Sequence, residues 1–135
     1  MLKKTISYED FNGNSLTEDF YFNLSKAEIA QMELEYPGGL SGFIDRIVKA
    51  QDTPTLIGLF KDIILRSYGV KSEDGKHFVK NDKLREEFES HAAFSVLYME
   101  LVTDANKASE FMNGIIPADV ASKMKELENK EPKAS

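Results

Sequence analysis

The side chains that could carry chemistry in this sequence are few, and carboxylates dominate them. The densest acidic group lies between positions 82 and 100 and comprises Asp82, Glu86, Glu87, Glu89 and Glu100. Paired carboxylates can act as general acid and base when burial raises the pKa of one of them. Leu84 and Phe88 mark the apolar side of the same helical turns, so we expect the glutamates on the solvent side. A solvated face is the main interpretation, and an acidic surface that docks a partner is the alternative.

Nucleophiles, metal ligands and phosphate loops are not indicated either. The chain has no cysteine, which excludes thiolate chemistry, and its two histidines are His77 and His91. His91 has apolar neighbours and is expected to be half-buried and hydrogen-bonded. The acidic turn 72–75 lacks the ligand spacing of an EF-hand loop, and the glycines of 37–42 lack the ending of a phosphate loop. We therefore predict no catalytic residue, no metal site, no cofactor and no enzyme activity.

Charge and hydropathy argue against two further classes of partner. The 135 residues include 17 basic and 23 acidic side chains, which gives a formal charge of −6. Binding to nucleic acid requires Lys and Arg to neutralise phosphates, whereas the segment 81–117 has three basic and seven acidic side chains. No apolar run approaches the roughly 18 residues of a membrane span, and no signal sequence is recognisable. We expect neither a nucleic-acid partner nor a membrane partner.

A β-hairpin and a capped helix are predicted at the start of the chain. Apolar residues alternate on both sides of Asn12-Gly13, a pair that accepts positive φ, so residues 2–24 are predicted to form a hairpin. Ser25 and Glu28 fit the capping box, in which each side chain accepts a hydrogen bond from the other residue's amide. A helix is expected to begin there and to end near Tyr36.

Two more helices are predicted before the middle of the chain. One covers residues 41–51, where apolar residues recur at helical spacing. The other follows Thr53, whose hydroxyl precedes a proline suited to the first helical position, and is expected to end at Gly69. Because this third helix is apolar around most of its circumference, we place it in the centre of the fold.

The remaining elements complete an α+β fold that is mostly α. Residues 70–79 are predicted to form a short second hairpin. A long helix is then expected from about 82 to 103, with Ser90 as the candidate break, followed by a short helix over about 105–113. We predict that residues 1–117 form a single compact domain. Residues 118–135, which contain no aromatic residue, are predicted to be a polar tail that is partly helical or disordered.

Two apolar groups are candidate partner-binding residues. Tyr21 lies opposite the inward face of its strand, and the edge of a terminal hairpin can pair with another chain. Phe111, Met112, Ile115 and Ile116 adjoin the polar tail, where apolar side chains are harder to bury. For both groups, simple packing in the core is the main interpretation, and a partner surface is the alternative.

Three segments of the chain carry a recognisable pattern. The first is Asp19–Glu28 (DFYFNLSKAE), which is similar to an opening of the form FYFNLTKAEL. The second is Tyr68–Phe78 (YGVKSEDGKHF), and the third is Asn106–Pro117 (NKASEFMNGIIP). In this order they resemble tail assembly chaperones of bacteriophages and prophages with long non-contractile tails, the siphophage type, and the resemblance extends over residues 1–117.

The resemblance implies a non-catalytic role in tail morphogenesis. Such chaperones bind the long, helical tape measure protein in the cytoplasm of the infected bacterial host and help to recruit subunits of the major tail-tube protein. They are absent from the mature virion. Self-association is left open. A structural tail protein or head-tail connector protein retained in the virion is the alternative function.

Overall fold

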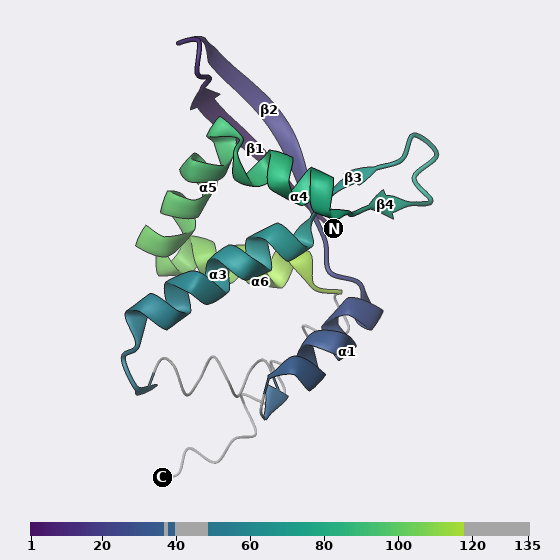
Figure 1. The fold of residues 1–135 in the computed structure, drawn as a ribbon, viewed down its shortest axis with the longest axis vertical. Helices are drawn as coiled ribbons and strands as arrows, with labels where there is room; N and C mark the ends of the chain where they lie inside the picture. Colours follow the sequence, from purple (N-terminus) through teal and green to yellow (C-terminus); the bar gives the residue numbers. More distant parts are fainter. Residues whose placement is uncertain (37, 40–48, 118–135) are drawn as a thin grey trace.

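A four-stranded antiparallel sheet with the order β1-β2-β3-β4 organises the molecule, and helices α3, α4, α5 and α6 pack around it (Figure 1). The computed structural model describes residues 1–36, 38–39 and 49–117. Within these residues, helix accounts for 54% and strand for 21%, so the predicted α+β class, mostly α, is confirmed.

The N-terminal hairpin is formed as predicted. Strands β1 (Leu2–Glu9) and β2 (Ser15–Phe22) pair antiparallel over their full length. Gly13 has a φ of 84°, and the Asp10 carboxylate accepts hydrogen bonds from the amides of Asn12 and Asn14 at 2.9 and 2.8 Å. Leu16, expected on the core face, is 40% exposed, because every residue from 11 to 19 near the turn lies outside the packed region.

Helix α1 (Lys26–Glu35) begins with the predicted capping box. The Glu28 amide donates to Ser25 Oγ at 3.1 Å, and the Ser25 amide donates to Glu28 Oε1 at 3.0 Å. The helix ends at Tyr36, as expected. The helix predicted over 41–51 lies mostly on residues 40–48, outside the described residues.

Helix α3 (Thr53–Ser67) differs from the prediction at both ends. The cap is Asp52 rather than Thr53, because the Asp52 carboxylate accepts from the Thr55 amide at 3.3 Å. The helix stops at Ser67, and Gly69 belongs to β3 (Tyr68–Lys71), which pairs with β2. A Cβ atom at Gly69 would lie 2.7 Å from the Phe78 ring, so the glycine permits the close approach of β4 (Phe78–Val79).

The predicted long helix is two helices, α4 (Asp82–Glu89) and α5 (Ala92–Thr103). The break falls at the expected place, because Ser90 Oγ donates to two carbonyls of the last turn and His91 adopts an extended conformation that caps α5. Helix α6 (Ala105–Ile115) extends two residues past the predicted end and contains Gly114. A Cβ atom there would lie 2.9 Å from Leu2, so the glycine lets α6 approach β1.

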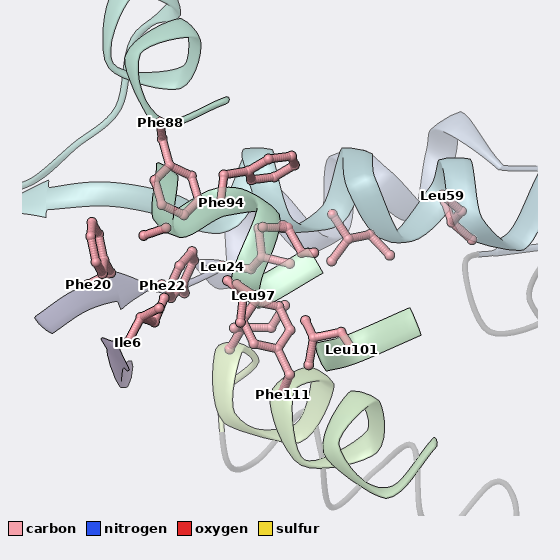
Figure 2. Packing of buried hydrophobic residues seen from close by; sticks show 14 of the residues in the cluster. Ile6, Phe20, Phe22, Leu24, Leu59, Phe88, Phe94, Leu97, Leu101 and Phe111 are labelled. Atoms are coloured by element: carbon pink, nitrogen blue, oxygen red, sulfur yellow. The ribbon is translucent and has the colours of Figure 1, made fainter. Parts of the chain in front are cut away.

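The core lies where β1 and β2 meet α3, α4, α5 and α6 (Figure 2). Phe88 is 1% exposed, and its ring stacks on Tyr68 with centroids 4.2 Å apart. Phe22 packs edge-on against both Phe88 and Phe111, which joins the sheet to α4 and α6. The largest fully buried apolar side chains are Phe22, Phe88, Phe111, Leu24, Ile63, Ile64, Leu97, Leu101 and Ile115.

Candidate partner-binding surface

An open apolar groove lies between α3, the end of α5 and α6. Its volume is about 490 Å³. Helix α3 contributes one wall and α6 the other, and the last turn of α5 lies between them. The groove is lined by Thr53, Leu56, Ile57, Phe60, Leu101, Val102, Thr103, Ala105, Ala108, Ser109 and Met112.

Two sets of hydrogen bonds position the helices that form this groove. Tyr98 Oη donates to the Ile57 carbonyl at 3.1 Å, which ties α5 to α3. Asp104 is in an extended conformation and ends α5, and its carboxylate caps α6 by accepting from the amides of Asn106 and Lys107 at 3.0 and 3.2 Å. The chain therefore turns sharply between α5 and α6 with its amides satisfied.

The chemistry of the groove is that of a binding surface. The polar groups among the lining side chains are three hydroxyls, of Thr53, Thr103 and Ser109, and none of the lining side chains ionises near neutral pH. Acid–base or nucleophilic catalysis needs an ionisable group placed beside the reacting atom, so the groove offers no such chemistry. An open apolar groove between helices suits the apolar face of another helix.

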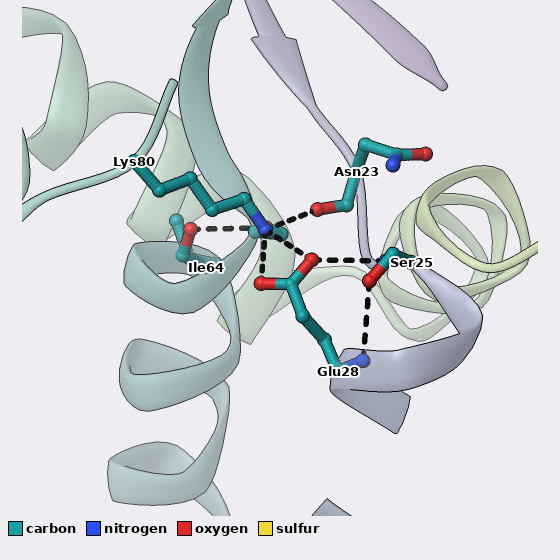
Figure 3. A network of polar contacts seen from close by, with 6 residues as sticks. Asn23, Ser25, Glu28, Ile64 and Lys80 are labelled. Atoms are coloured by element: carbon teal, nitrogen blue, oxygen red, sulfur yellow. Dashed lines mark hydrogen bonds and ion pairs between the residues drawn. The ribbon is translucent and has the colours of Figure 1, made fainter. Parts of the chain in front are cut away.

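Apart from the groove, a cluster of polar side chains joins α1 to the rest of the fold (Figure 3). Lys80 Nζ donates to the Asn23 carbonyl at 2.6 Å and to the two carboxylate oxygens of Glu28 at 2.9 and 2.7 Å. Burial lowers the pKa of the Lys80 ammonium group. Partial burial alone would raise the pKa of Glu28, but hydrogen bonds from Lys80 and the Ser25 amide outweigh it, and the pKa of Glu28 is lowered.

This cluster is structural, because its charges satisfy one another. A polar pocket of about 200 Å³ adjoins it, and there Arg66 pairs with Glu35 at 2.8 Å and with Asp62 at 2.9 Å. A general acid or base needs a pKa near neutral pH, whereas the pKa of the Glu28 carboxyl is lowered and so lies further from neutral pH than usual. The Lys80 contacts therefore fix the start of α1 against the sheet.

The glutamates of α4 and His91 have the surroundings that the sequence predicted, whereas Glu100 is less exposed than expected and His77 lies outside the strand predicted for it. Glu86, Glu87 and Glu89 are exposed, and Glu89 pairs with Lys61 at 2.8 Å. Glu100 is half-buried between Lys4 and Lys107. His91 is also half-buried, and its Nδ1 accepts from the Ala93 amide at 3.0 Å. His77 is exposed in the turn before β4.

Residues 1–36, 38–39 and 49–117 contain neither a cluster suited to a metal ion nor a helix suited to a membrane. No group of three His, Asp or Glu side chains there is arranged to hold a metal ion. None of the helices in these ranges is long and apolar enough to cross a membrane.

The five predicted partner-binding residues differ in burial and in surroundings. Phe111 and Ile115 are 2% and 0% exposed, so these two belong to the core and offer no open surface. They are buried because the chain returns to the sheet, where the Leu24 amide donates to the Ile115 carbonyl at 2.7 Å. Ile116 is half-buried against the same core, and only Met112 reaches the groove.

Tyr21 is half-buried on the other face of the sheet. It lies in β2, paired with Lys3 of β1 and Gly69 of β3, so it is not at an edge. The Lys71 ammonium group lies 5.3 Å from the centroid of its ring, a cation–π contact.

Sequence reasoning missed most of the residues that line the groove. Leu56, Ile57 and Phe60 belong to the helix that the sequence places in the centre of the fold, and Leu101 and Val102 belong to the predicted long helix. The available signal was that α3 is apolar on too many sides for a helix of a small domain. One of those sides is half-buried and faces the groove.

Comparison with known proteins places the chain in a family. A family model described as phage tail assembly chaperone matches residues 1–135, the whole chain. No curated protein and no solved structure matches. The family match agrees with the resemblance of the segments 19–28, 68–78 and 106–117. The chain therefore belongs to the phage tail assembly chaperone family.

Proposed function

We propose that this chaperone binds an apolar helical segment of the tape measure protein in the groove between α3, α5 and α6 and helps to recruit tail-tube subunits around it. It acts in the cytoplasm of the bacterial host, has no catalytic activity, and is absent from the mature virion. The observation that carries the proposal is the open apolar groove in a member of a tail assembly chaperone family.

The groove suits a helix with one apolar face. Leu56, Ile57 and Phe60 are spaced one, three and four residues apart, so they form one stripe along α3. This stripe faces α6 across the open groove, so part of its apolar surface is in contact with water. Binding of a ligand would bury that surface, which is favourable. A tape measure helix whose apolar residues recur three and four apart would bury its own stripe against this one.

The charge distribution supports a protein partner. Glu86, Glu87 and Glu89 are exposed on α4 and are not among the residues that line the groove. A surface of this charge repels the phosphates of nucleic acid, which leaves the apolar groove as the main surface for binding a partner.

The test is co-expression of the chain with the tape measure protein of its phage, followed by affinity capture and a titration of the complex. Leu56→Glu places a charge in the groove and is expected to weaken binding more than tenfold, about 1.4 kcal/mol or more. Leu34→Glu is the matched control, because Leu34 is 89% exposed on α1 and lies outside the groove. Equal binding by Leu56→Glu and the wild-type chain, with both folded, would contradict the proposal.

Analysis of purified virions by mass spectrometry separates the proposal from the alternative function. A chaperone is expected to be present in the lysate and absent from mature particles. A structural tail or head-tail connector protein would instead remain in the particle at a fixed stoichiometry.

A further inference from the structure

Strand β1 forms one edge of the sheet. It pairs with β2 along all eight of its residues, and its other side has no strand neighbour within the part of the chain that the structure describes (Figure 1). An edge strand presents alternate N–H and C=O groups that can pair with another chain. Of the usual protections, β1 has no proline and no bulge and is not very short, and the charges on its exposed side are Lys3 and Glu9.

The exposed face of this edge is complementary to itself. Lys3, Thr5, Ser7 and Glu9 are exposed, while Ile6 and Tyr8 point into the core. If two β1 strands pair antiparallel with Ile6 opposite Ile6, then Lys3 lies opposite Glu9 twice, and Thr5 lies opposite Ser7 twice. Opposite charges directly across a strand pair are favourable. A shift of the register by two residues in either direction leaves Lys3 and Glu9 opposite uncharged side chains, so the charges select this register.

Helix α5 runs antiparallel along β1 on the core side. The rings of His91 and Tyr8 lie 5.0 Å apart at one end, and Lys4 Nζ lies 3.3 Å from Glu100 at the other. His91 and Glu100 are nine residues apart along the helix, and Tyr8 and Lys4 are four residues apart along the strand. Both separations correspond to about 13 Å, which is consistent with this alignment. Val96 is midway between His91 and Glu100, so it lies level with Ile6.

The exposed side of α5 is apolar at this level. Val96 is 41% exposed and Met99 is 53% exposed, and the two are three residues apart on the same helix face. Isolated exposed apolar side chains are common, but this pair occupies the stretch of α5 that runs beside the centre of the β1 edge.

We infer that two copies of this chain form a two-fold dimer in which β1 pairs antiparallel with β1 and Ile6 faces its counterpart. The two sheets then form one continuous sheet, the helices of both copies lie on the same face, and the Val96 side chains approach each other near the two-fold axis. The dimer carries two copies of the groove, so it can engage a long helical partner at two points, a consequence that rests on the proposed function.

Charge reversal at the edge tests the register directly. The wild-type chain is expected to sediment at about 30 kDa, twice its 15.2 kDa, at low ionic strength. Lys3→Glu and Glu9→Lys each turn two attractive pairs into two repulsive ones and should weaken the dimer on the order of tenfold. The double variant Lys3→Glu/Glu9→Lys restores both pairs and should restore the dimer.

Controls of equal charge keep the test specific. Lys76→Glu and Glu73→Lys make the same changes of net charge in the exposed turn between β3 and β4, and they are expected to leave the dimer unchanged. In the wild-type chain, amide exchange at alternate residues of β1 should slow as the protein concentration rises.

Three results would overturn the inference. One is a 15.2 kDa species at every concentration. Another is a dimer that is indifferent to Lys3→Glu, or that the double variant does not restore. The third is amide exchange in β1 that is independent of concentration. Each can be obtained without the tape measure protein, so failure here is distinguishable from failure of the proposed function.

Discussion

The core around Phe88 and the groove around Phe60 are both apolar, yet one is closed and the other is open. Phe88 is 1% exposed and its ring contacts Phe20, Phe22, Tyr68 and Phe94. Phe60 is half-buried in α3 and lines a groove of about 490 Å³. The same residue type thus has two roles, because burial decides how much of its apolar area already stabilises the fold and how much remains for a ligand.

The largest effect is expected in the closed region. Phe88→Ala removes the ring on which Tyr68 stacks and leaves a cavity, so we expect the free energy of unfolding to fall by about 3–5 kcal/mol. Urea denaturation followed by circular dichroism measures this change. A loss below about 1 kcal/mol would mean that the aromatic cluster can collapse onto the vacancy, and the contrast with the groove would be lost.

A smaller effect is expected where a polar cluster joins α1 to the closed region. Lys80→Met keeps the length of the side chain but leaves Glu28 and the Asn23 carbonyl without their ammonium partner. The Lys80 side chain is 16% exposed, so we expect a loss of about 1–3 kcal/mol. The matched control is Lys76→Met, at an exposed position in the turn before β4, which should leave the midpoint of urea unfolding unchanged.

The pH dependence of this cluster has a defined sign. The pKa of Glu28 is lower in the folded state than its ordinary value of 4.5, so the carboxylate stabilises the fold at neutral pH. That contribution is lost as pH falls from about 4.5 through the folded pKa. We therefore expect wild type to be more stable than Glu28→Gln at pH 7 and the difference to shrink below about pH 4.5. Thermal melts of both proteins across this range measure it; a constant difference would contradict the assignment.

One wall of the open region depends on a single helix cap. Asp104→Ala removes the acceptor for two amides at the start of α6 and is expected to cost about 1 kcal/mol. Asp104→Asn keeps the capping acceptor and removes the charge, so it should retain most of the stability. Differential scanning calorimetry of the two variants separates the cap from the charge; equal losses would show that the charge dominates.

Local signals in the sequence predicted most of the elements. Asn12-Gly13 fixed the first turn, Ser25 with Glu28 fixed the start of α1, and Ser90 marked the break before α5, because each acts through hydrogen bonds or dihedral angles within a few residues. The errors at Thr53 and Gly69 have different causes. Asp52 precedes Thr53 and caps the helix in its place. Gly69 is needed because the Phe78 ring of β4 packs closely against its backbone, a contact that the sequence alone does not reveal.

The groove could not be predicted, because it depends on how three helices meet. A helix with one apolar side open to solvent and a fully buried helix have the same apolar pattern. The many apolar sides of α3 therefore did not show that the side of Leu56 and Phe60 is the one that lacks a neighbour. The opposite case is Phe111 and Ile115. Their nearness to the polar tail made them candidates for a partner surface, but they are core residues, which is the interpretation that the sequence favoured. In both cases the deciding contact joins residues far apart in the chain, such as Leu24 and Ile115.

The smallest effect on stability is expected at Phe60. This small effect distinguishes the open groove around Phe60 from the closed core around Phe88. Phe60→Ala removes a ring that is already partly in water, so the unfolding free energy should fall by about 1 kcal/mol or less, against several for Phe88→Ala. Binding of the tape measure protein should show the reverse order, with Phe60→Ala weakened and wild-type stability nearly retained. If Phe60→Ala instead destabilises the fold as much as Phe88→Ala does, the groove is part of the core, and its open state does not persist in solution. Measuring both variants by urea denaturation and by capture of the tape measure protein decides between a fold that happens to leave a gap and a surface that is kept open for a ligand.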